Sequence, residues 1–352
     1  MQPNKIFPPL YFNIDEWLQL RDINTGGTRN KAVYVSPDNI PYYFKTSINR
    51  DKRNYPFEFW SEIIASQLGK LLQLPVLEYH ISTRNDKIGC LSKSMIELSV
   101  EELVDGVNLI LQFEPNFKEI CKTEHYFWKI ERVLKNVGLL EYRRIAVEMV
   151  LFDCIIGNTD RHSENWALIK NKRGEAVYSY IKKMNCIRRI IEFWLIHREL
   201  KIPFFEIPKL VALARHRFAP FFDNGSSLGR ELSEEKLSRM LKNDILFDNF
   251  FSGGTSDIIV NEGKKKSFLE TIDYLLETYP DESVHFFTNH LLYYKKEEWE
   301  KIVDEIDNNY PKEGFETSRI SKLRKDFVVK LIDERVKYIK DKVNYYGHQI
   351  RI

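Results

Sequence analysis

The chain has 352 residues, of which 30% are charged and 43% hydrophobic, and its formal net charge at pH 7 is +2. This balance is typical of a globular chain large enough for two lobes. A net charge so close to zero argues against nucleic acid as the main ligand. No stretch reaches the roughly 18 apolar residues that span a membrane, and residues 1–9 lack the apolar core of a signal peptide. We expect a cytoplasmic protein, with a secreted effector as the alternative.

The four cysteines are widely spaced and include no Cys-x-x-Cys pair. A zinc site or a disulfide framework built on them is therefore not expected. We expect reduced thiols in the core at Cys90, Cys121, Cys154 and Cys186.

The first third of the chain predicts strands with a single helix. The helix is expected over residues 58–72, where apolar side chains recur at helical spacing. A turn is expected at residues 36–39, because Pro, Asp and Asn favour turn dihedrals. Strands are expected over residues 31–35, 42–46, 74–82 and 89–95.

Beyond residue 96 the pattern turns mostly helical. Helices are expected over residues 141–156, 180–200, 268–277, 297–306 and 321–343. The chain thus predicts an α+β fold with two lobes. The β-rich N-lobe would comprise residues 1–97 and the larger helical C-lobe residues 98–352, with a helical insertion at about 176–217.

The segment that follows the apolar helix 141–156 crowds five potentially catalytic side chains into one short loop. A polar loop that caps a helix would be the simplest interpretation. Phosphoryl transfer, however, needs a carboxylate for the attacking hydroxyl and an amide oxygen for Mg²⁺ a few residues later. Asp160 and Asn165 have this Asp-x-x-x-x-Asn spacing.

A second segment, residues 218–227, predicts an apolar strand that ends at Asp223 and is followed by a turn containing Gly225. Mg²⁺ prefers carboxylate oxygen and usually takes one or two protein carboxylates beside phosphates. Asp223 is therefore a candidate metal ligand. Alone it would more often be an Asx-turn at a strand end, but its place downstream of Asp160 and Asn165 favours the metal role.

Upstream of both segments lies a candidate phosphate-binding loop. Paired glycines let backbone N–H groups approach phosphate oxygens, although in a hairpin they more often form only a turn. Its candidate residues are Gly26, Gly27, Thr28 and Lys31. Lys45, on the second expected strand, is a candidate for clamping ATP. Its partner would be Glu58 or Glu62, which lie four apart on one helical face.

The order of these motifs is that of an ATP–Mg²⁺ phosphotransferase site. Thr159-Asp160-Arg161-His162-x-x-Asn165, followed by Pro220-x-x-Asp223-Asn224-Gly225-Ser226-Ser227, resembles the C-terminal domain of HipA-like serine/threonine kinases. Residues 27–32 resemble their phosphate loop, and residues 62–69 resemble the N-lobe helix. The similarity runs from about residue 25 to 279 and indicates the short, stand-alone type that is similar to CtkA-like kinases.

This resemblance implies a protein-kinase-like fold, ATP and Mg²⁺ as cofactors, and a protein substrate. It implies that Asp160 is the catalytic base, supported by His162, and that Asn165 and Asp223 hold the metal. Lys45 would bind the α- and β-phosphates. Relatives that act as toxins imply an antitoxin or inhibitor protein as a partner. Toxin HipA kinases autophosphorylate a loop serine, and at the matching place near Asn24 only Thr25 and Thr28 supply hydroxyls.

Four alternatives remain open at this stage. A small-molecule phosphotransferase would use the same Asp-x-x-x-x-Asn arrangement. A lipid kinase would need basic residues after Asp223, where residues 224–235 hold only Arg230. A nucleotide-binding pseudokinase or interaction module would not need the full set of site residues. A metal hydrolase built on His162 would need a second histidine nearby in the sequence.

Overall fold

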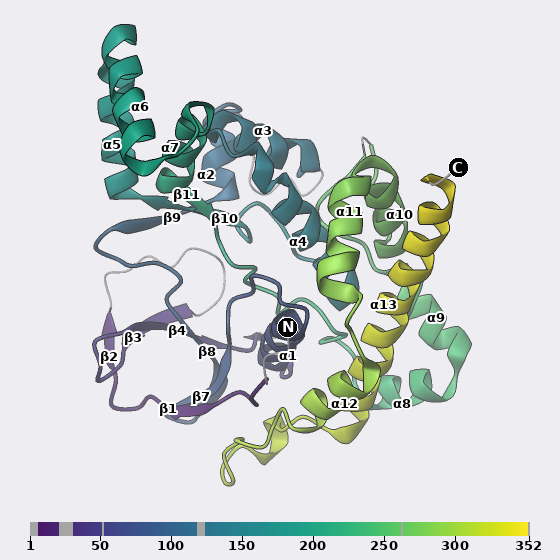
Figure 1. Ribbon diagram of the computed structural model, residues 1–352. Coiled ribbons are helices and arrows are strands. Elements are labelled where there is room, and N and C mark those ends of the chain that lie inside the picture. Colours follow the sequence, from purple (N-terminus) through teal and green to yellow (C-terminus); the bar gives the residue numbers. More distant parts are fainter. Residues whose placement is uncertain (1–5, 21–30, 51–52, 118–123, 262, 351–352) are drawn as a thin grey trace. The chain divides into compact units, whose positions relative to one another are not determined.

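Two compact units make up the chain in a computed structural model that describes residues 6–20, 31–50, 53–117, 124–261 and 263–350 (Figure 1). The first unit combines Met1–Ser94, Val147–Arg161 and Pro220–Ile352, and the second combines Met95–Ala146 and His162–Ala219. The predicted lobe boundary at residue 97 and the predicted insertion at 176–217 remain predictions.

A curved six-stranded sheet forms the N-terminal part of the first unit (Figure 1). Its strand order is β1-β7-β8-β4-β3-β2, and all neighbours are antiparallel except the parallel pair β1 and β7. One side is filled by a cluster of Ile14, Tyr34, Phe44 and Leu91. The strands are β1 (Tyr11–Asn13), β2 (Leu18–Leu20), β3 (Lys31–Val35), β4 (Pro41–Thr46), β7 (His80–Arg84) and β8 (Lys87–Lys93), with β5 (Asn49–Arg50) and β6 (Arg53–Asn54) as a separate pair.

The helix α1 (Glu58–Leu71) packs against β4 and β8. Residues 58–69 are all buried, because both the sheet and the helix α12 contact it. An all-round buried helix is expected to be apolar, yet α1 carries Glu58 and Glu62 into this interior. Charged groups at such positions need partners, and these partners define the candidate site below.

The remainder of the first unit is helical. A capping box begins α10, since Ser267 accepts from the backbone N–H of Glu270 and the Glu270 carboxylate accepts from the Ser267 backbone N–H. The helices are α8 (Glu234–Lys242), α9 (Asp244–Gly253), α10 (Phe268–Thr278), α11 (Pro280–Phe286), a π-helical turn (Phe287–Leu291), α12 (Lys296–Asp304) and α13 (Lys322–Ile350). The helix α4 (Arg143–Ile156) contributes residues 147–156 to this unit.

The second unit contains a three-stranded antiparallel sheet in the order β11-β10-β9. Its strands are β9 (Glu101–Asp105), β10 (Ala167–Asn171) and β11 (His216–Phe218), and its helices are α2 (Gly106–Leu111), α3 (Phe127–Val137), α5 (Lys172–Lys183), α6 (Cys186–Leu200) and α7 (Ile207–Arg215). The helix α6 exposes a row of large apolar side chains, namely Ile187, Ile190, Ile191, Trp194 and Leu195.

The predicted α+β class is confirmed, with a β-rich N-terminal part that has one main helix and a mostly helical remainder. Three local predictions are wrong. Residues 180–200 form two helices, because Asn185 caps a new helix by accepting from the backbone N–H of Arg188. The strand predicted over 74–82 begins only at His80. The strand predicted before Asp223 ends at Phe218, since Pro220 lacks the N–H that would continue the ladder.

The cysteine prediction is confirmed at two positions and wrong at one. Cys90 and Cys154 are free and buried, whereas Cys186 is free but exposed at the start of α6. Cys121 lies outside the described residues. Among the described residues, none of the helices has the length and apolar character required to cross a membrane.

The buried His216 gives the second unit a pH-dependent stability. Burial, together with the charge of Arg215, lowers the pKa of His216 to about 4. In the unfolded chain this histidine has an ordinary pKa near 6.5. As pH falls from about 6.5 to 4, it therefore becomes protonated in the unfolded chain while it stays neutral in the folded chain. We expect His216 to cost about 2 kcal/mol of unfolding free energy between pH 7.5 and 5. In urea unfolding, His216→Gln should lose less unfolding free energy between pH 7.5 and 5 than the parent does. The variant His197→Gln, which changes an exposed histidine, should lose as much as the parent.

Candidate functional site

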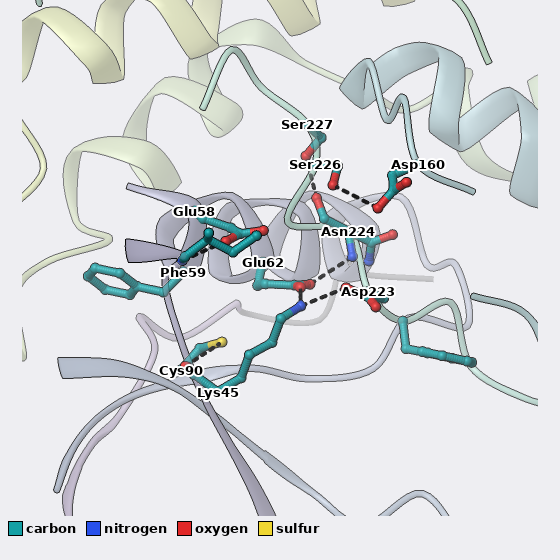
Figure 2. A network of polar contacts seen from close by, with 12 residues as sticks. Lys45, Glu58, Phe59, Glu62, Cys90, Asp160, Asp223, Asn224, Ser226 and Ser227 are labelled. Carbon is teal, nitrogen blue, oxygen red and sulfur yellow. Dashed lines mark hydrogen bonds and ion pairs between the residues drawn. The ribbon is translucent and has the colours of Figure 1, made fainter. Parts of the chain in front are cut away.

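The side chain of Lys45 lies buried between two carboxylates of the first unit (Figure 2). Its Nζ donates to Glu62 Oε1 on α1 and, at 2.6 Å, to Asp223 Oδ1. The residues Lys45, Glu62 and Asp223 are 5%, 0% and 6% exposed, respectively. Strand β4 supplies the lysine, since the pairing of Lys45 with Cys90 on β8 fixes its register.

The two helix glutamates have different partners, which resolves the alternative left open by the sequence. Glu62 pairs with Lys45. Glu58 pairs instead with Arg230 and also accepts from the backbone N–H of Ile48 at 3.0 Å. The four-residue spacing placed both acids on one face of α1, and only the fold shows that they face different cations.

Glu62 also holds the loop that carries Asp223. Its Oε2 accepts from the backbone N–H of Asn224 at 2.8 Å. Asp223 itself has a left-handed backbone, with φ of 58°, a conformation that Asp and Asn tolerate better than most side chains. A Cβ added at Gly225 would lie 2.9 Å from Glu62 Oε1 and 3.1 Å from Glu58 Cγ. Glycine at this position therefore lets the loop approach α1 closely.

Arg161 joins the two motif segments from within the first unit. Its guanidinium makes a two-pronged contact with Asp153 on α4, with both distances 2.8 Å. It also donates to the carbonyl of Phe222 and, at 2.6 Å, to Asn224 Oδ1. Arg161 and Asp153 are both fully buried. Burial lowers the pKa of Arg161, but the charge and hydrogen bonds of Asp153 raise it more, so the net pKa lies above the ordinary value.

Asp160 lies next to this junction and reaches the same loop. Ser226 Oγ donates to Asp160 Oδ2 at 3.4 Å (Figure 2). The backbone N–H of Thr159 donates to the Ser226 carbonyl at 3.2 Å. The backbone N–H of Asp160 donates to Asn158 Oδ1 at 3.2 Å. Thr159 and Ser226 also line a cavity of about 440 Å³ together with Tyr55 and Arg230.

His162 and Asn165 belong to the second unit. Nδ1 of His162 accepts from the backbone N–H of Glu164 at 3.3 Å, and the His162 carbonyl accepts from the backbone N–H of Asn165 at 2.9 Å. The side chain of Asn165 is buried. The carbonyl of Ser163 accepts from the backbone N–H of Val107 at the start of α2, so hydrogen bonds order this half of the loop.

The predicted phosphate loop falls outside the described residues at Gly26, Gly27 and Thr28. Lys31 begins strand β3, and its backbone pairs with that of Lys45. The first unit thus brings together Lys45, Glu62, Asp223 and Asp160 in one network.

Sequence reasoning assigned no role to Asp153 or Ser226. A signal was present for Asp153, since it is an acid in a helix whose neighbours at 149–152 are all apolar, and a buried acid requires a partner. Ser226 gave no such signal, because serine in a Gly-Ser-Ser turn is ordinary in a loop.

Comparison with known proteins bears on the fold. Neither a protein-family model nor a curated protein sequence matches the chain. The proinflammatory kinase CtkA of Helicobacter pylori has a similar structure, with a TM-score of 0.66 and 17% identity over 96% of this chain and 99% of that one. The fold is kinase-like. The predicted resemblance to HipA-like kinases is thereby confirmed at the level of the fold.

A further match is the toxin–antitoxin system HipA and HipB with its operator DNA from Shewanella oneidensis MR-1. Its TM-score is 0.49 with 9% identity, over 91% of this chain and 66% of that one.

The close approach at Gly225 can be tested with two glycine-to-alanine changes. Gly225→Ala should lower the free energy of unfolding by roughly 1–3 kcal/mol, because the new methyl overpacks against Glu62 and Glu58. Gly253→Ala is the matched control, since in the described part of the chain no atom beyond its neighbours and its own helix backbone lies within 4 Å of a Cβ added there. Thermal and urea unfolding would measure both. Equal stability of the two variants would contradict the described packing of the loop on α1.

Proposed function

We propose that the chain is an ATP- and Mg²⁺-dependent kinase of the HipA-like kind that phosphorylates Ser or Thr hydroxyls of a protein target. The observation that carries the proposal is the buried lysine with its two carboxylates. Lys45, Glu62 and Asp223 come from a strand, a helix and a distant loop. Protein kinases use a strand lysine, a helix glutamate and a metal-binding aspartate in the same way.

The residues present fit a phosphate-bound Mg²⁺. Within the group of Lys45, Glu62, Asp153, Arg161 and Asp223, two cations face three carboxylates, so the group carries one net negative charge. Burial raises the pKa of the nearby Tyr79 phenol well above the ordinary value. The charges of Glu62 and Asp223 raise this pKa further, while a hydrogen bond with the Asp223 backbone lowers it. A hard cation with carboxylate ligands would relieve this excess.

Each residue receives a role in this proposal. Lys45 binds the α- and β-phosphates, and Glu62 keeps its ammonium in place. Asp223 holds the metal, with Asn165 assigned as a further ligand on motif spacing alone. Asp160 orients and accepts the proton of the attacking hydroxyl, supported by His162. When bound, Mg²⁺ neutralises charge on the transferred phosphoryl group. Gly26, Gly27, Thr28 and Lys31 cover the phosphates.

The ion pair made by Arg230 favours a protein substrate over a lipid headgroup. It is the single cation in residues 224–235, and its guanidinium is in an ion pair with Glu58. That pairing reduces its capacity to bind an anionic headgroup. The same proposal includes a division into an N-lobe of residues 1–97 and a C-lobe of residues 98–352 with an insertion at 176–217. It also includes an antitoxin or inhibitor protein as a partner. Both parts rest on the motif resemblance.

The proposal is tested by phosphate transfer from γ-labelled ATP in the presence of Mg²⁺, with the chain alone and with a generic protein substrate. Asp160→Asn should lower the transfer rate by two to four orders of magnitude, the range expected for loss of a general base. ATP affinity should change by less than about threefold, because Asp160 acts on the hydroxyl rather than on the nucleotide.

The matched control is Asp248→Asn, which alters an exposed carboxylate on α9. Its transfer rate should equal that of the parent. Nucleotide binding without label on protein would favour a small-molecule phosphotransferase or a pseudokinase, and no binding of Mg²⁺·ATP would reject the proposal.

The two helix glutamates provide a second, internally controlled test. Glu62→Gln should lower kcat/KM for ATP at least tenfold, because a neutral amide no longer holds the Lys45 ammonium. Glu58→Gln should act mainly on the free energy of unfolding, since its partner is Arg230. Steady-state kinetics and urea unfolding of both variants would separate the effects. Equal kinetic losses in the two would contradict the assigned roles.

A further inference from the structure

A cluster of two histidines and one glutamate lies in the first unit among residues that the proposed kinase chemistry does not use. Nδ1 of His285 is 3.1 Å from Oε1 of Glu148, and Nε2 of His290 is 3.5 Å from the same oxygen. One ligand atom from each of the three residues lies within 4.8 Å of the others. Glu148 is on α4, His285 is near the end of α11, and His290 is in the π-helical turn.

A π-helical turn begins at Phe287, two residues after His285, and contains His290. Residues five apart point about 140° away from each other around a regular α-helix. Here the chain widens at Phe287–Leu291, and the backbone N–H of Leu292 donates to the carbonyl of Phe287 five residues earlier. Within such a wider turn, residues five apart point in more similar directions than they do in an α-helix, and π-helical turns are frequent at functional sites.

The hydrogen bond on the far side of His290 fixes which of its nitrogens carries a proton. Nδ1 lies 2.7 Å from the carbonyl of Leu72. A carbonyl can only accept, so Nδ1 carries the proton. In the neutral ring, Nε2 then presents its lone pair to the carboxylate oxygen of Glu148. Two lone pairs at 3.5 Å repel unless a proton or a metal ion lies between them.

We propose that Glu148, His285 and His290 form a binding site for Zn²⁺. Two imidazole nitrogens and a carboxylate oxygen are an established ligand set for this ion, with a water in the fourth position. Ligands at about 2.0–2.1 Å in tetrahedral geometry lie about 3.3 Å apart. The two distances to Glu148 Oε1, 3.1 and 3.5 Å, bracket that value.

The surroundings suit a bound ion. A metal-ligating histidine usually donates its other ring N–H to a carbonyl or carboxylate, as His290 does to Leu72. The side chain of His285 is 34% exposed while that of Glu148 is 5% exposed, so the cluster has both a solvent side and a buried side. The bound ion would join α4 to α11 and to the π-helical turn. His290 also contacts the end of α1 through the carbonyl of Leu72.

The test uses the full chain, treated with EDTA and desalted, in buffer without nucleotide. Zn²⁺ is added in competition with a chromogenic chelator, and the melting temperature is recorded in parallel. We expect about one equivalent to bind and the melting temperature to rise. The double variant His285→Ala/His290→Ala should bind at least tenfold more weakly, whereas His197→Ala, on the exposed helix α6, should bind as the parent does.

No Zn²⁺ binding by the parent, or unchanged binding by the double variant, would overturn the proposal. If circular dichroism shows that the double variant does not fold, two further measurements test the site. Glu148→Gln keeps the size of the side chain and should also weaken binding at least tenfold. Co²⁺ bound to the parent should show the intense visible bands of a four-coordinate ion, displaced by Zn²⁺. Weak six-coordinate bands, or none, would reject the site.

Discussion

The buried ammonium of Lys45, shared by Glu62 and Asp223, is the interaction on which the placement of the other candidate site residues of the first unit depends. Three fully or nearly buried charges would be costly if any one were misplaced, because each has given up its hydration. The three charges can pair with one another only if β4, α1 and the loop after Phe222 meet at one point. The charge pattern thus selects one packing of α1 on the sheet among the many that apolar contacts alone would allow.

A second buried pair carries this constraint to the segment around Asp160. Arg161 is anchored by Asp153 on α4 and donates to Phe222 and Asn224 on the Asp223 loop. Removing one member of a buried pair typically costs 3–5 kcal/mol, since it leaves the other charge uncompensated. Within the first unit, the Arg161 side chain therefore holds the segment that ends at Asp160 and Arg161 against the loop that carries Asp223.

Much of the site could be predicted from the sequence, and the limits have physical causes. Lys45, Asp160 and Asp223 could be singled out as candidates because phosphoryl transfer restricts both residue type and order, and the structure brings Lys45 and Asp223 into contact. The choice between Glu58 and Glu62 could not be made, since their shared face is a local property while their partners, Arg230 and Lys45, lie far away in the chain. Strand β9 (Glu101–Asp105) was missed because its polar residues hide the alternation expected of a half-buried strand.

The left-handed backbone at Asp223 has a consequence for how this chain can change by mutation. At φ of 58°, the replacements that the backbone tolerates best are glycine and asparagine. Neither provides a carboxylate, while glutamate, which would, lacks the short side chain that eases this conformation. A tolerated substitution at this position therefore removes the carboxylate completely. A lineage released from selection on the carboxylate should pass through Asn or Gly at 223, at a cost in stability because Lys45 loses one of its carboxylate partners.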